Sequence, residues 1–450
     1  MNLLRRLRPS PRSRRVIVIA LDGTPYTFAC RMMTDGTMPN FARLLREGSL
    51  TRMRSSHPDV SGVAWSSFMT GTNPGKHGIF GFIDRRPYSY QTYIPTAQNL
   101  QCETLWDMLS RHGRRVCAIG VPMSYPPKPV NGVLVGCFLS PSVEKAAYPP
   151  TLGQELKEMG YRVDTDPWAA RESLERFLED YRDTLARRVE AIFRLLHREE
   201  WDFFMAHIIE TDRLHHFLWG QYAEQDPQYC SAFLDCYRQI DDFLGQVASE
   251  ADGDHELIIL SDHGSCAIRQ EVYLNHWLAE RGYLRFRRQP PESLEDIDAD
   301  SVAYGLDPGR VYINLRGREP EGRVAPGVEY ERLREELAQG LSDLRDPDTG
   351  EPMVARVHRR EDIYFGPASP GAPDLLVQTR DGYDVKGSLH HPTLTGRSPL
   401  TGMHTFDDAM LYLRGARQLR DGSSIVDVMP TILRLMDVPA PDGLDGRSCL

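Results

Sequence analysis

The chain lacks the features that mark three broad classes of protein. Its eight cysteines are scattered and form no Cys-x-x-Cys pair, which argues against a disulfide framework or a cysteine-ligated metal site. No apolar stretch is long enough to cross a bilayer, and a net charge of -10 argues against the basic face of a nucleic-acid binder. We therefore expect a cytoplasmic protein with no integral membrane segment and no nucleic-acid polymer as partner.

The composition and length are those of a large globular protein. The 450 residues are 41% hydrophobic and 26% charged, enough for a large core together with an insertion or a second domain. Residues 1–15 are rich in arginine and precede the first apolar run. We expect them to form a solvated basic tail.

Apolar runs alternate with amphipathic patterns along most of the chain. Runs at 16–21, 203–209 and 257–260 read as buried strands, and residues 174–198 have helical periodicity. This rhythm predicts an α/β fold with a doubly wound, mostly parallel sheet. Between residues 285 and 397 Pro, Gly, Arg and Asp become frequent, which predicts an inserted α+β cap subdomain. The core would then comprise residues 16–284 and 398–450.

Acidic residues and histidines follow each of the three apolar runs. Asp22 ends the first, Asp262 and His263 end the third, and Asp212 and His216 stand four residues apart after the second. Residues four apart on a helix face the same way. Because function gathers at the carboxyl ends of parallel strands, we expect these side chains to converge.

Asp and His without Cys form a donor set that suits zinc and, as a second choice, manganese. Two such ions can clamp the attacking and leaving oxygens of a phosphate displacement. His404, just after the predicted cap, is the candidate for the last ligand.

Taken singly, each of these candidate ligands has a plainer interpretation as a strand cap, a turn residue or a member of a surface pair. His215 is the neighbour with which His216 could be confused, and His207 is a candidate supporting contact.

Ser61 is the candidate nucleophile. It precedes a helical pattern, so it lies at or near a helix N-terminus, which favours a phosphate oxyanion. A metal ion on its oxygen would activate it. The plainer interpretation is a helix N-cap, a common role of serine.

Residues 61–79 resemble the nucleophile segment of type I phosphodiesterases/nucleotide pyrophosphatases, which belong to the alkaline phosphatase superfamily. Four further motifs match that family in the same order: residues 21–23, 211–216, 261–264 and 402–404. The resemblance implies an alkaline phosphatase-like fold and two divalent metal ions. It implies that one ion is held by Asp22, Ser61, Asp262 and His263, and the other by Asp212, His216 and His404. Family members often carry Thr where this chain has Ser61.

These observations predict a metal-dependent phosphoester hydrolase that forms a phosphoseryl intermediate on Ser61. A phosphodiesterase or nucleotide pyrophosphatase acting on a small phosphoester is the first hypothesis. A phosphomonoesterase or phosphotransferase of the same superfamily is the alternative within this chemistry. From a different class, the alternative is a non-catalytic metal-binding protein that kept the fold. The sequence assigns no substrate-binding residue and no oligomeric state.

Overall fold

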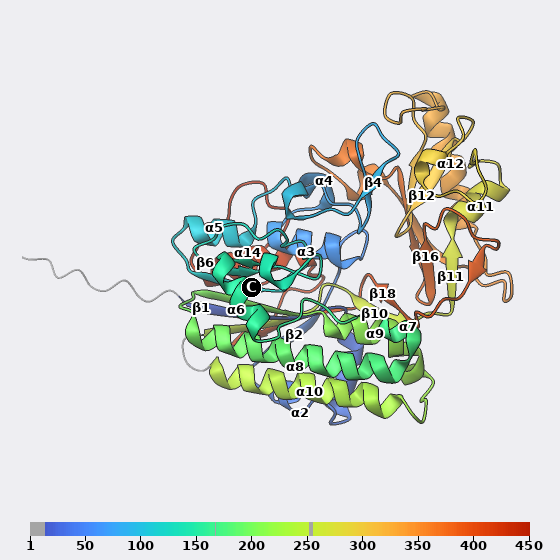
Figure 1. Ribbon diagram of the computed structural model, residues 1–450. Helices are drawn as coiled ribbons and strands as arrows, with labels where there is room; N and C mark the ends of the chain where they lie inside the picture. Colours follow the sequence, from blue (N-terminus) through green and yellow to red (C-terminus); the bar gives the residue numbers. More distant parts are fainter. Residues whose placement is uncertain (1–13, 167, 252–254) are drawn as a thin grey trace, which may run out of the picture.

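Figure 1 shows the computed structural model, which describes residues 14–166, 168–251 and 255–450. Of the predicted basic tail, only Arg14 and Arg15 fall within the described residues, and Arg15 begins the first strand. Within the described part of the chain, no helix combines the length and the apolar character needed to cross a membrane.

A mixed sheet of eight strands forms the centre of the molecule, in the order β2-β19-β9-β1-β8-β5-β6-β7. The strands from β9 to β6 run parallel to one another, while β2, β19 and β7 pair antiparallel at the two edges. The prediction of a mostly parallel α/β sheet is confirmed. The bounds are β1 (Arg15–Leu21), β2 (Gly48–Met53), β5 (Val116–Ile119), β6 (Gly132–Val135), β7 (Ala147–Tyr148), β8 (Phe203–Ile208), β9 (His255–Leu260) and β19 (Ala409–Arg414).

Helices cover both faces of this sheet, as the doubly wound prediction requires (Figure 1). The alternation of side chains along β1 shows why. Ile17, Ile19 and Leu21 enter one hydrophobic cluster, and Val16 and Ala20 enter the other. The first cluster includes residues of α1 (Tyr26–Thr34), α2 (Pro39–Leu44), α6 (Pro150–Glu158), α8 (Leu174–Arg198), α9 (Glu210–Ala223) and α10 (Cys230–Glu250). The second includes residues of α3 (Ser61–Thr70), α5 (Leu105–Arg111) and α14 (Val428–Leu435).

A second lobe stands beside the core in Figure 1 and has a hydrophobic cluster of its own. An antiparallel sheet has the order β12-β13-β15-β14, and a three-stranded sheet has the order β16-β11-β17. We call this lobe the cap. It includes β11 and α11, which precede residue 285, and the boundaries of an inserted subdomain, residues 285–397, stay a prediction. The bounds are β11 (Gln270–Tyr273), α11 (Leu274–Glu280), β12 (Ala303–Leu306), β13 (Arg310–Ile313), α12 (Val328–Ser342), β14 (Val354–Arg359), α13 (Arg360–Ile363), β15 (Leu375–Thr379), β16 (Tyr383–Lys386) and β17 (Thr395–Gly396).

Two short antiparallel ribbons complete the structure. One pairs β10 with β18 and sets Ser265 opposite His404. The other pairs β3 with β4. The bounds of these and the remaining short elements are α4 (Pro74–His77), β3 (Asp84–Arg85), β4 (Thr92–Tyr93), η1 (Ala97–Asn99), η2 (Val143–Lys145), α7 (Ala169–Glu172), β10 (Gly264–Ala267), η3 (Leu294–Asp296), η4 (Ser369–Gly371), β18 (Gly402–Thr405) and η5 (Ile425–Asp427).

Candidate metal centre

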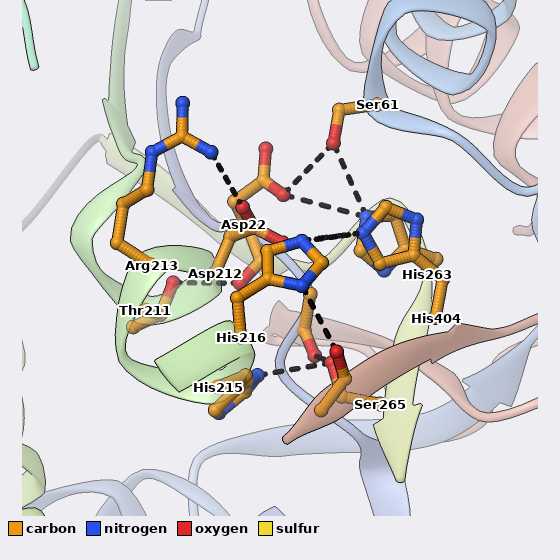
Figure 2. A network of polar contacts seen from close by, with 12 residues as sticks. Asp22, Ser61, Thr211, Asp212, Arg213, His215, His216, His263, Ser265 and His404 are labelled. Atoms are coloured by element: carbon orange, nitrogen blue, oxygen red, sulfur yellow. Dashed lines mark hydrogen bonds and ion pairs between the residues drawn. The ribbon is translucent and has the colours of Figure 1, made fainter. Parts of the chain in front are cut away.

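The carboxyl ends of three neighbouring strands bring the predicted residues together. In the sheet β1 lies between β8 and β9, with Leu21 paired to Ile208 and Ala20 paired to Leu260. The chain segments that follow these strands therefore begin side by side. Figure 2 shows the resulting cluster, in which side chains from strand ends, helices and β18 point toward one another. Its predicted members are Asp22, Ser61, Asp212, His216, Asp262, His263 and His404.

Asp212, His216 and His404 form a compact triangle of donor atoms. Asp212 Oδ1 lies 3.2 Å from His216 Nε2 and 3.4 Å from His404 Nε2, and the two imidazole nitrogens are 3.1 Å apart. Ligand atoms around a tetrahedral zinc ion with bonds of about 2.0–2.1 Å are separated by about 3.4 Å. The three donors therefore have the spacing of ligands of one ion.

A second group of donors surrounds Ser61. Its Oγ lies 3.2 Å from Asp22 Oδ1 and 3.2 Å from His263 Nε2. His263 Nε2 in turn lies 3.5 Å from Asp22 Oδ1 and 3.5 Å from Asp262 Oδ2. Asp262 Oδ2 is buried and accepts no hydrogen bond, while Asp262 Oδ1 accepts one from the backbone amide of Gly23. The donor atoms that lie within ligand spacing of one another in this second group are those of Asp22, His263 and Asp212, so Asp212 borders both groups. Asp262 adjoins the group through His263.

The three imidazoles of the cluster are oriented in the same way. Nδ1 of His216, His263 and His404 each donates to a backbone carbonyl, at 3.0, 2.9 and 2.9 Å. Because Nδ1 carries the donated hydrogen, Nε2 is the ring nitrogen of each imidazole that faces the cluster and that would bind an ion. The Nε2 atoms of His216 and His404 lie 3.1 Å apart, so either a shared proton or a bound ion occupies the space between them.

Further side chains fix the orientation of the carboxylates. Trp65 Nε1 and His207 Nε2 both donate to Asp22 Oδ2, at 2.9 and 2.7 Å, which turns Oδ1 toward Ser61. Arg213 donates from Nη1 to Asp212 Oδ2 at 3.1 Å, which leaves Asp212 Oδ1 for the imidazoles. Arg213 is itself held through Nε and Nη2 by Asp164, at 3.0 and 2.7 Å.

The electrostatics of the cluster show an excess of negative charge. Burial and the charge of Asp22 raise the pKa of Asp262 to about 8. Burial would lower the pKa of His263, but the carboxylates of Asp262 and Asp22 raise it to about 10. Burial would also raise the pKa of Asp22, yet hydrogen bonds from His207 and His263 hold it below its usual range. A bound cation would remove this excess and return Asp262 to its ionised form.

Two side chains of the cluster, Trp65 and Arg213, were not predicted from the sequence, and His215 had been left open as an alternative to His216. His215 points away from the cluster, with Nδ1 on Ser265 Oγ and Nε2 on Tyr237. His207, expected as a supporting contact, bonds Asp22. Trp65 and Arg213 carried no clear signal, although Trp65 stands one helical turn after Ser61 and Arg213 directly follows Asp212.

A cavity of about 650 Å³ opens beside the cluster, between the core and the cap. His216 and His404 contribute to its wall, together with Asp59 from the core. Phe82 and the cap residue Lys386 also line it. A molecule in this cavity can reach the donor atoms of the cluster and contact the cap at the same time.

The mixed sheet with helices on both faces and an Asp/His cluster at its carboxyl edge defines an α/β protein of the alkaline phosphatase-like fold. The family model "Type I phosphodiesterase / nucleotide pyrophosphatase" matches residues 16–407. The chain belongs to this family of phosphoester hydrolases, and the family resemblance found in its motifs is confirmed.

Solved structures share the fold at low sequence identity. Phosphonoacetate hydrolase from Sinorhizobium meliloti 1021, in complex with phosphonoacetate, is 15% identical with a TM-score of 0.63, covering 96% of each chain. Human ectonucleotide pyrophosphatase/phosphodiesterase 5 is 13% identical with a TM-score of 0.58, covering 96% of this chain and 97% of that one. Among curated protein sequences there is no match.

Proposed function

We propose that this chain is a metal-dependent phosphodiesterase that acts on small phosphodiesters through Ser61. The observation that carries the proposal is the position of Ser61 Oγ, 3.2 Å from both Asp22 Oδ1 and His263 Nε2. A serine with the plainer role of an N-cap would bond the amides of its own helix. Here Val60 is the N-cap and Ser61 is the first residue of α3. The Ser61 hydroxyl instead faces the buried Asp22 carboxylate and His263 imidazole.

In this proposal the two donor groups hold two divalent ions. Asp22, Ser61, Asp262 and His263 would hold one, and Asp212, His216 and His404 would hold the other. The Asp/His donor set supports zinc, with manganese as the second choice. Bound ions supply Lewis-acid stabilisation of phosphate charge and lower the pKa of the serine hydroxyl.

The residues of the chain account for the course of a displacement. Ser61 Oγ attacks phosphorus, the bond from phosphorus to the leaving alcohol oxygen breaks, and a covalent phosphoseryl ester forms that keeps the second substituent of the diester. The proton that Ser61 loses balances the one that the departing alkoxide takes up. Ser61 is the first residue of α3, so the phosphoryl oxygens would meet the free amides and the positive end of the helix dipole. Water then attacks phosphorus, the bond to Ser61 Oγ breaks, a phosphomonoester leaves, and a proton from the water returns to the serine oxygen.

Replacement of the nucleophile tests the proposal. We expect Ser61→Ala to lower diester turnover by about three orders of magnitude or more, because an alanine cannot form the covalent intermediate. Six of the seven proposed ligands remain, so metal content should stay close to that of the wild type. Ser61→Thr is the matched control, since it keeps a hydroxyl at the same position. Unchanged turnover of Ser61→Ala would remove this residue from the mechanism.

The substrate class is tested with a matched pair of reporters, bis(p-nitrophenyl) phosphate and p-nitrophenyl phosphate, on metal-loaded protein. We expect faster turnover of the diester. Faster turnover of the monoester would replace the proposal with a phosphatase. Turnover of neither by protein with full metal content would favour the non-catalytic alternative.

We also propose a cytoplasmic location. The eight cysteines are all free in the structure, which supports a reducing compartment.

A further inference from the structure

A second cavity, of about 770 Å³, lies between the core and the cap and shares no lining residue with the cavity at the metal centre. The core contributes the segment from Gly78 to Tyr93, which includes the β3–β4 ribbon. The cap contributes residues around β13, α13 and η4. Its volume falls in the range of small-molecule sites.

Arginine is the dominant charged residue of this wall. Arg85, Arg318 and Arg360 line the cavity, and Asp84 is its one carboxylate among the described residues. The local balance is positive although the whole chain has a net charge of -10. The charge of this wall is therefore opposite in sign to the net charge of the chain, as expected for a site that binds an anion.

Arg85 has unused hydrogen-bonding capacity. Its side chain is only 4% exposed, yet Nε and Nη1 have no hydrogen-bond partner. Its Nη2 lies 3.4 Å from Glu319 Oε1, and its guanidinium stacks 5.0 Å from the centre of the Tyr312 ring. A buried charged donor without an acceptor costs more free energy than a neutral one, so this arrangement indicates a ligand that accepts hydrogen bonds.

The carboxylates nearby cannot fill this role because they are already committed. Asp84 accepts from Arg310 and from the amide of Phe80. Glu319 accepts from Arg318 Nε at 2.8 Å and from the amide of Leu315. Asp374 accepts from Arg318, Arg360, Tyr330 and the amide of Ile313. Four guanidinium groups thus face three carboxylates, and the remaining positive charge belongs to the group with the fewest partners, Arg85.

We propose that this cavity is a second ligand site, which binds a phosphate group through Arg85, Arg318 and Arg360. Planar guanidinium groups match tetrahedral oxyanions through paired N–H donors. Ser369 Oγ, buried at the same wall and without a partner, supplies a further donor. Tyr88 and Tyr93 form an aromatic side of the cavity with room for the substituent of a phosphate ester. The ligand would bridge the core and the cap at a distance from the metal centre.

The test measures phosphate binding to the full-length, metal-loaded protein by equilibrium dialysis against labelled inorganic phosphate at low salt. We expect wild-type protein to bind phosphate at a site that persists after chelation of the metals. Arg85→Met should weaken binding at this site at least tenfold, while diester turnover stays within about twofold of wild type. Arg360→Gln at the rim, where the side chain is 24% exposed, should weaken it about threefold.

Arg316→Met is the matched control, since Arg316 is exposed, precedes Gly317 and Arg318, and does not line the cavity. It removes the same charge and should leave binding unchanged. Phenyl phosphate in the Ser61→Ala background distinguishes the source of the phosphate group: tighter binding than inorganic phosphate indicates an ester, and equal binding indicates the free ion. Should Arg85→Met and Arg360→Gln, both folded by circular dichroism, retain wild-type phosphate binding after chelation, the proposal is wrong.

Discussion

The metal centre buries charge opposite in sign to that of the second cavity, the one lined by Arg85, Arg318 and Arg360, which we call the cap cavity. Each of the two sites leaves polar atoms without a partner. In the metal centre Asp212 Oδ1 and Asp262 Oδ2 accept no hydrogen bond, whereas in the cap cavity Arg85 Nε and Nη1 donate none. Buried charge is costly unless it is paired. The sign of the unpaired group therefore indicates the sign of the ligand: cations at the carboxylates, and an anion at the guanidinium.

The two sites also differ in how they are built. Strand ends of one parallel sheet position the carboxylates of the metal centre, and buried donors such as Trp65 and His207 fix their orientation. The cap cavity is lined by short segments from two lobes, joined by the buried contact of Arg310 with Asp84. We infer that the geometry of the metal centre depends on the sheet, and that of the cap cavity on the contact between lobes.

The largest predicted effect is that of metal removal, which should abolish activity at the metal centre and leave ligand binding in the cap cavity intact. We expect chelation to lower diester turnover by about three orders of magnitude or more, since the ions contribute several kcal/mol of transition-state stabilisation. Added zinc or manganese should restore it. Phosphate binding in the cap cavity should survive the same treatment. Full activity in protein shown by elemental analysis to be metal-free would contradict the two-metal proposal.

The next largest predicted effect is on the free energy of unfolding, when the contact of Arg310 with Asp84 between the cap and the core is lost. Arg310 is fully buried and donates to Asp84, to the carbonyl of Ile83 and to that of Asp307. Arg310→Met leaves the buried Asp84 without its cation, and we expect it to lower the free energy of unfolding by about 3–5 kcal/mol. Urea unfolding followed by fluorescence measures this change.

The control for that variant removes both charges. Asp84→Asn combined with Arg310→Met leaves no uncompensated buried ion, so part of the lost stability should return. If the single and double variants are equally unstable, the effect arises from lost packing of the arginine stem and not from charge.

Much of the metal centre could be predicted from the sequence because its chemistry is local to three strands. The apolar runs before Asp22, Asp212 and Asp262 are β1, β8 and β9, and these strands are neighbours in the sheet. Strand periodicity and the carboxyl-edge rule were sufficient to place these carboxylates together. His404 is different: it is brought in by β18, which pairs antiparallel with β10. No periodicity predicts such a pairing. His404 was singled out by its place just after the predicted cap and by the family resemblance.

The cap was harder to predict for a physical reason. Its strands are four to six residues long apart from the shorter β17, and it is joined to the core by contacts between residues far apart in the chain. Arg85 stacks on Tyr312, and Arg310 bonds Asp84 across 226 positions. Such contacts leave no trace in hydropathy or spacing, so the second cavity could be found only in three dimensions.

Replacing Arg213 tests whether this residue fixes the orientation of the Asp212 carboxylate in the metal centre. Its bond to Asp212 Oδ2, backed by Asp164, turns Oδ1 toward His216 and His404. We expect Arg213→Met to weaken metal affinity by about 10–100-fold, the usual cost of losing a residue that orients a ligand. Competition with a chelating dye measures it. Arg187→Met, an exposed change on α8, is the control, and equal affinity of both variants would assign Arg213 a purely structural role.

The smallest predicted effect lies at Asp22, where two donors share one oxygen. Trp65→Phe removes the indole N–H but keeps the aromatic packing, and His207 still donates to Asp22 Oδ2. The net loss of one hydrogen bond is worth about 1 kcal/mol, or roughly a fivefold fall in diester turnover. Phosphate binding in the cap cavity should not change. A fall of several orders of magnitude in turnover, with normal folding and metal content, would mean that Trp65 and not His207 determines which oxygen of Asp22 faces Ser61.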